Sequence, residues 1–164
     1  MTSLVYPLEQ VLDIKKKRVE KAEAVVREKK EALQLELNKL AEREKERDKV
    51  KKHHQDKLNQ LRAEMDTGTT ATKIQQMKDY LDVVKQKVLV EQKKVDEQKE
   101  QVKIAEDNLE AAKEELRLRR NEVDKMNTHK SDWTKQARRE LEIEEEKEMD
   151  EIGTIMHTLH QRMK

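Results

Sequence analysis

The stretch Asp66-Thr67-Gly68-Thr69-Thr70-Ala71-Thr72 interrupts a chain whose other residues mostly favour helix. Glycine adopts the left-handed conformation that ends a helix without steric cost, so Gly68 is expected to terminate one helix. Thr72 followed by Gln75 fits a capping box, which marks the start of another helix. A turn this short makes the two helices antiparallel neighbours. We therefore expect one hairpin domain over residues 1–164, with helix one at about 8–65, the turn at 66–72 and helix two at about 73–162.

The composition excludes a thick globular core. Of the 164 residues, 45% are charged and only 34% are hydrophobic, with no Phe and no Cys. Two glycines, Gly68 and Gly153, and one proline, Pro7, leave little to interrupt long helices. The expected fold class is all-α, with two long helices forming an antiparallel coiled coil and the second helix longer than the first.

A heptad repeat is the strongest pattern, because apolar residues spaced by seven form one seam along a supercoiled helix. In the second half the series is unbroken: Ile74, Leu81, Val88, Val95, Val102, Leu109, Leu116 and Val123. In the first half seven of nine positions are apolar: Val5, Leu12, Val19, Val26, Leu33, Leu40, Arg47, His54 and Leu61. The two series predict the buried contact between the helices.

Folding the chain about the turn aligns the two seams. The predicted apolar pairs are Leu12 with Met126, Val26 with Ala112, Leu33 with Ala105 and Leu61 with Met77. In the same register Arg47 faces Glu91 and His54 faces Val84. The second seam position is polar at Lys15, Lys29, Glu36, Arg43, Glu91 and Gln98, so the middle of the hairpin is expected to be weakly packed.

Helix two is expected to overhang helix one from about residue 131. A stripe of Leu141, Met149, Ile152, Met156, Leu159 and Met163 then has no partner within the hairpin. Residues 127–132 are weak helix formers, so a kink is one alternative, although the pattern favours a continuous helix.

The overhang also supplies the candidate partner-binding residues. These are Trp133, Arg138, Arg139, Leu141, Met149, Ile152, Met156 and Leu159. Trp133 has two interpretations. It is placed opposite Val5 and Tyr6, where Leu4, Tyr6 and Leu8 would close the open end around it, and this capping role is favoured over a role as an exposed binding anchor.

Few residues point to chemistry. The two glycines lie too far apart for a phosphate-binding loop, and His157 with His160 lack a third metal ligand. No catalytic residue, cofactor site or metal site is predicted. Arg117, Arg119 and Arg120 form a basic cluster, but the chain has neither the basic excess nor the stacking aromatics of a nucleic-acid binder. No apolar run is long enough to span a membrane.

The short first helix, the Gly/Thr turn and the longer Trp-bearing second helix resemble the YscO/FliJ family of type III secretion stalk proteins, in particular its chlamydial branch. The resemblance covers essentially the full length and depends on architecture and heptads, since the family has no short diagnostic motif. It implies a non-enzymatic stalk or adaptor whose open end, the start of helix one plus Trp133 to Lys164, binds a hexameric secretion ATPase.

The resemblance also implies partners at the other end, namely the export gate, chaperones or the needle-length regulator. The expected location is cytoplasmic, with a peripheral position at the secretion apparatus on the inner membrane left open. The isolated chain is expected to be an elongated monomer. The alternative from the residues alone is a structural coiled-coil rod that self-associates into an oligomer or filament.

Overall fold

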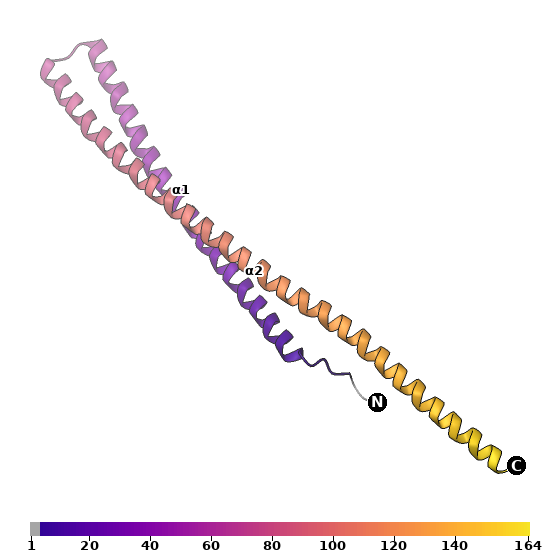
Figure 1. The fold of residues 1–164 in the computed structure, drawn as a ribbon. Helices are drawn as coiled ribbons and strands as arrows, with labels where there is room; N and C mark the ends of the chain where they lie inside the picture. Colours follow the sequence, from indigo (N-terminus) through magenta and orange to yellow (C-terminus); the bar gives the residue numbers. More distant parts are fainter. Residues whose placement is uncertain (1–3) are drawn as a thin grey trace. The chain divides into compact units, whose positions relative to one another are not determined.

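The computed structural model describes residues 4–164, and within that range the chain forms two helices and no strand. α1 spans Glu9–Thr67 and α2 spans Ala71–Arg162 (Figure 1). The second helix, at 92 residues, is longer than the first, at 59. The predicted all-α fold class is therefore confirmed, as expected for a chain rich in Glu, Lys, Leu, Gln and Ala.

Gly68 makes the turn, as predicted, with a positive φ of 84°. On one side of it, the Thr67 hydroxyl donates to the Ala63 carbonyl at the end of α1. On the other side, the capping prediction was wrong. The Thr70 hydroxyl accepts a hydrogen bond from the Lys73 backbone N–H at 3.3 Å, so the residue before α2 provides the cap.

The residues of the predicted capping box have other roles. Thr72 lies inside α2, and the Gln75 amide donates to Asp79 one turn further along. The N-cap position needs a short oxygen-bearing side chain on the last non-helical residue, and Thr70 meets that need two residues earlier than expected.

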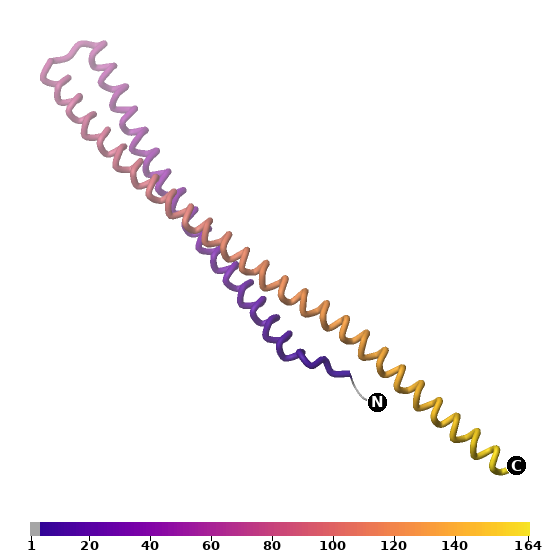
Figure 2. The backbone as a smooth tube through the Cα atoms, in the orientation of Figure 1, coloured from indigo at the N-terminus to yellow at the C-terminus, as the bar shows by residue number. Residues whose placement is uncertain are grey.

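The chain divides into two compact units, the first of which contains the turn and covers residues 24–114. Contacts between the helices fix their direction, since Glu64 bonds to Lys73, His53 to Tyr80 and Glu36 to Gln98. Residue numbers fall along α1 as they rise along α2, so the two arms run antiparallel (Figure 2). The most deeply buried side chains here are Val95, at 0% exposure, and Val84, at 1%.

Polar side chains occupy part of the seam in this unit. The Gln98 amide donates to the Glu36 carboxylate at 2.6 Å and to its backbone carbonyl at 3.0 Å, and both side chains are half-buried. Arg47, which was predicted to face Glu91, donates its hydrogen bond to the neighbouring Gln92 at 3.3 Å, while Glu91 bonds to Lys94 of its own helix. The predicted seam residue Arg43 is exposed, and its neighbour Glu44 is half-buried instead.

The other unit contains residues 4–23 and 115–164. Ion pairs of Lys15 with Glu122 at 3.4 Å and of Glu9 with Lys130 at 2.7 Å again indicate antiparallel segments. Leu12 is fully buried between them. α2 runs unbroken through residues 127–132, as the pattern favoured, and continues past the start of α1 (Figure 1).

Candidate functional site

The predicted seam residues line the contacts within the two units. Leu12, Val26, Leu61 and Ala105 are buried, and Leu33, Met77, Ala112 and Met126 are half-buried. These side chains are occupied by packing inside the chain. Surfaces for other molecules must therefore lie elsewhere, and the structure presents two candidates, one in each unit.

The first candidate begins at an aromatic cluster in the unit of residues 4–23 and 115–164. Tyr6, in the segment before α1, is only 4% exposed. Its ring meets Trp133 edge-on, with the centroids 5.6 Å apart, and lies at the same distance from the His129 ring. The Tyr6 hydroxyl and His129 Nδ1 are hydrogen-bonded. Trp133 is half-buried beneath this cluster, as its capping role required.

Only one of the residues expected around Trp133 is buried. Leu4, Val5 and Leu8 are 39%, 69% and 41% exposed, so the expectation that Leu4 and Leu8 close the open end was wrong, as was the seam position assigned to Val5. The physical reason is that α1 begins at Glu9. Residues 4–8 are not helical, and a heptad count does not predict which of their side chains point inward.

Beyond Trp133 the predicted stripe is largely uncovered. Leu141 is half-buried, and the exposed fractions of Met149, Ile152, Met156, Leu159 and Met163 are 69%, 56%, 64%, 52% and 86%. Arg138 and Arg139 are exposed next to Leu141. We call residues 141–163 the tail, and these six apolar residues the tail stripe. Apolar side chains repeated along one exposed helix face make the tail stripe the first candidate surface for another molecule.

The tail offers no metal site among the residues that the structure describes. No group of three or more His, Cys, Asp or Glu side chains is placed to hold an ion within residues 4–164. The His157 ring lies 3.0 Å from the Gln161 amide rather than next to a set of ligands. In the same range, no helix is sufficiently long and apolar to cross a lipid bilayer.

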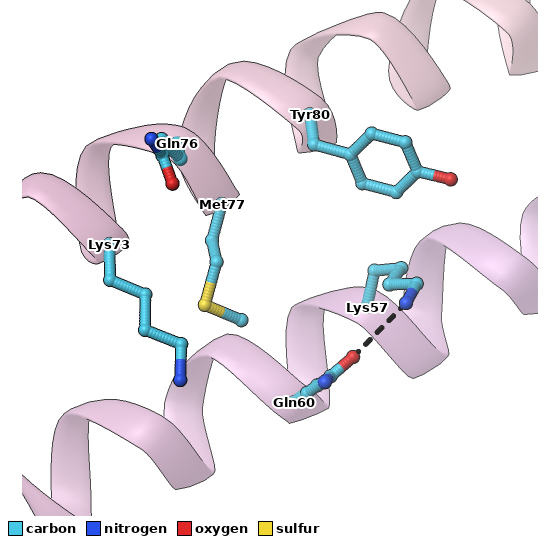
Figure 3. Close-up of a pocket in the computed structure, with 6 residues that line it drawn as sticks. All are labelled: Lys57, Gln60, Lys73, Gln76, Met77 and Tyr80. Carbon is cyan, nitrogen blue, oxygen red and sulfur yellow. Dashed lines mark hydrogen bonds between the residues drawn. The ribbon is translucent and has the colours of Figure 1, made fainter. Parts of the chain in front are cut away.

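The second candidate is a shallow groove near the turn, in the unit of residues 24–114. It lies between α1 and α2 and is lined by Lys57, Gln60, Lys73, Gln76, Met77 and Tyr80. Figure 3 shows Met77 reaching from α2 toward α1, with Lys73 and Tyr80 on either side of it. Lys57 Nζ donates to Gln60 at 3.2 Å and lies 5.8 Å from the centre of the Tyr80 ring.

Sequence reasoning missed this groove. The available signal was Tyr80, one of only three aromatic residues in the chain and 43% exposed. His53 holds the Tyr80 ring in place, because its ring nitrogen lies 2.8 Å from the Tyr80 hydroxyl and the two rings meet at 88°. The groove therefore combines an ordered aromatic ring, a methionine and two lysines.

Two carboxylates elsewhere carry electrostatic signatures of the interhelix contacts. The Gln98 amide, with help from Lys39, lowers the pKa of Glu36 below its ordinary value of 4.5. In the other unit Lys15 lowers the pKa of Glu122, with a smaller effect from Arg119. Both shifts arise because hydrogen bonds from the opposite helix favour the charged form of the carboxylate.

Comparison with known proteins identifies the fold as one already seen. The family model described as "YscO-like protein" matches residues 3–163. The chain is also similar to the solved structure of a putative YscO homolog from Chlamydia trachomatis, with 49% sequence identity and a TM-score of 0.95. That match covers 99% of this chain and 100% of the other. Among curated proteins, none matches.

Proposed function

Because the chain belongs to the YscO-like protein family, we propose that it is a non-enzymatic stalk or adaptor of a bacterial type III secretion system. In this proposal the tail binds the hexameric secretion ATPase. The other partners, namely the export gate, the chaperones or the needle-length regulator, bind in the unit that contains the turn. The protein acts in the cytoplasm, at the periphery of the secretion apparatus.

The tail stripe is the observation that supports the ATPase proposal. Within residues 4–164, its members from Met149 to Met163 are each more than half exposed, whereas seam residues such as Leu12 and Val95 are fully buried. Covering an exposed apolar stripe with a partner is favourable, because each Å² of apolar surface removed from water contributes about 25 cal/mol to the free energy of binding. The tail stripe is therefore the surface where a binding partner would bury the most exposed apolar side chains.

The groove near the turn supports the second half of the proposal. Tyrosine is a residue type enriched in protein-binding hot spots, and Tyr80 is exposed here, held by a hydrogen bond to His53 and next to Met77 in the groove. Lys73 is ion-paired with Glu64 at 3.2 Å, so Lys57 is the lysine of the groove that favours a partner with acidic side chains.

The test uses purified chain and purified secretion ATPase. Replacing Met149, Ile152, Met156 and Leu159 by Ser should weaken binding at least about tenfold and reduce the effect of the chain on ring assembly and ATP hydrolysis. The matched control replaces four exposed apolar residues outside the tail, Val83, Leu89, Val90 and Ile104, by Ser. The proposal would be contradicted if the stripe variant bound the ATPase, and changed its ring assembly and ATP hydrolysis, as strongly as the wild-type chain does.

A second experiment separates the two ends. A chain ending after Lys130 lacks the tail and Trp133, while the groove near the turn is intact. In a pull-down from the native cytoplasm, it should lose the ATPase and retain the other partners. Retention of the ATPase by the shortened chain would place that contact elsewhere.

A further inference from the structure

The last part of the tail has a heptad pattern of its own. Met149, Ile152, Met156, Leu159 and Met163 are separated alternately by three and four residues, which is the spacing of the two core positions in a coiled coil. All five are more than half exposed. This row therefore has the spacing of a coiled-coil core face and is left uncovered, so a second helix could pack along it.

The charges around this row are divided between its two ends. Residues 140–151 contain eight acidic side chains and one basic one, Lys147. Residues 152–164 contain no acidic side chain and carry Arg162, Lys164, His157 and His160. A helix that covers the row must therefore offer basic groups to the first half and can offer acidic groups to the second half.

A second copy of the tail meets both requirements, but only in one direction. In an antiparallel arrangement, the acidic half of each tail lies along the basic half of the other. In a parallel arrangement the two acidic halves face each other, and like charges across such a contact are destabilising. The heptad row is also compatible with reversal, because it reads as alternating three and four spacings from either end.

We propose that two copies of this chain pair through their tails as antiparallel helices, centred between Ile152 and Met156. In this arrangement Ile152 packs against Met156 of the second copy, and Met149 against its Leu159. The contact is two-fold symmetric and closed, so it yields a dimer and not a filament. About two heptads of contact make the association weak and dependent on concentration.

The dimer does not depend on the proposed ATPase contact, although both use the tail stripe. If both are correct, the chain without the ATPase is a monomer in dilute solution and a dimer at high concentration, and binding of the ATPase competes with the dimer for the tail stripe. The competing occupant of the row is an amphipathic helix of another protein with basic flanks. The experiments below use the purified chain alone, so their outcome is distinct from that of the ATPase test.

The first experiment is a charge exchange, followed by sedimentation equilibrium of the full chain over a range of concentrations. One variant carries Glu145→Lys, Glu146→Lys and Glu148→Lys; the other carries His160→Glu, Arg162→Glu and Lys164→Glu. The wild-type mass should rise from 19.6 kDa toward twice that value as concentration increases. Each variant alone should stay monomeric, and an equimolar mixture should dimerise.

The matched control carries three lysine substitutions on an exposed part of α1, Glu28→Lys, Glu31→Lys and Glu42→Lys. It changes the net charge by the same amount as the acidic-half variant and should dimerise like the wild-type chain. A wild-type chain that stays monomeric at every concentration, or a mixture of the two variants that fails to dimerise, would overturn the proposal.

The direction of pairing is tested by cross-linking, which is simple here because the chain has no cysteine. Glu145→Cys and Met163→Cys variants with different tags are mixed and oxidised. Antiparallel tails should give the mixed disulfide as the main product. Disulfides formed mainly within each variant would indicate parallel tails and would overturn the proposed arrangement.

Discussion

At the scale of single residues, Tyr6 holds the segment before α1 against α2. It is buried against Trp133 and hydrogen-bonded to His129, while its neighbours Leu4, Val5 and Leu8 are exposed. Replacing Tyr6 by Ala should detach residues 4–8 and expose Trp133 to water. The free energy of unfolding should fall by at least the contribution of one aromatic pair, roughly 0.5–1.5 kcal/mol.

Trp133 is the only tryptophan, so its fluorescence reports this contact directly. We expect a red shift of the emission in the Tyr6→Ala variant. The Tyr6→Phe control keeps the ring contact and loses only the hydroxyl, so its emission should remain close to that of the wild-type chain. A Tyr6→Ala spectrum identical to the wild type would show that the cluster does not shield Trp133.

Glu36 provides a second prediction at this scale. Its pKa is lowered mainly because the Gln98 amide donates to the charged carboxylate. A lowered pKa in the folded state means that this contact contributes stability above the unfolded pKa of about 4.5, and that the contribution is lost as the pH falls through the folded value. Gln98→Ala should raise the pKa of Glu36 toward 4.5, as followed by carboxyl ¹³C NMR.

The control for that titration is Gln101→Ala, which removes an exposed glutamine from the same helix. It should leave the titration of Glu36 unchanged. If Gln98→Ala and Gln101→Ala gave the same pKa as the wild-type chain, the hydrogen bond between the two helices would have no electrostatic role.

At the scale of the elements, α2 has chemically identical residues in opposite environments. Val95 is fully buried on the seam, whereas Val90, little more than one turn away, is 54% exposed. Val95→Ala should lower the free energy of unfolding by roughly 1.5–3 kcal/mol. Val90→Ala should change it by less than about 0.5 kcal/mol, because little packing is lost and Ala favours helix. Urea unfolding of both variants measures the difference, and equal losses would mean that the seam is not the main source of stability.

At the scale of the whole molecule, packing along the chain is uneven. Residues 142–164 are exposed throughout, whereas buried residues recur along both helices before them. Most helical stability in proteins comes from tertiary packing, and this end of α2 has no buried residue to oppose fraying. In dilute solution the amide hydrogens of residues 142–162 should therefore exchange with an opening free energy near zero, while those around Val84 and Val95 should require several kcal/mol.

Hydrogen exchange followed by mass spectrometry measures this difference. Protection of the tail should increase when the protein concentration is raised or the ATPase is added, since both proposed occupants cover the same stripe. A tail as protected as the seam in dilute solution would mean that the helix needs no partner, and would remove the physical basis for both proposals.

The sequence alone was sufficient for the fold class, the turn at Gly68, the continuity of α2 through residues 127–132 and the apolar stripe on the tail. These follow from residue type and heptad spacing, which are local properties. The resemblance to the YscO/FliJ family was also visible in that pattern, and the family match confirms it.

Only the tertiary structure decided which side chains meet across the two helices. Heptad spacing specifies the buried face of a helix, but it does not say which of two neighbouring polar residues on the partner accepts a hydrogen bond, and Arg47 donates to Gln92. The sequence placed Tyr6 near Trp133, but only the structure shows that Leu4, Val5 and Leu8 are exposed because residues 4–8 are not helical. Likewise, only the structure shows that His53 holds the Tyr80 ring beside the groove. Such contacts depend on axial position and side-chain rotamer, and neither is encoded in periodicity.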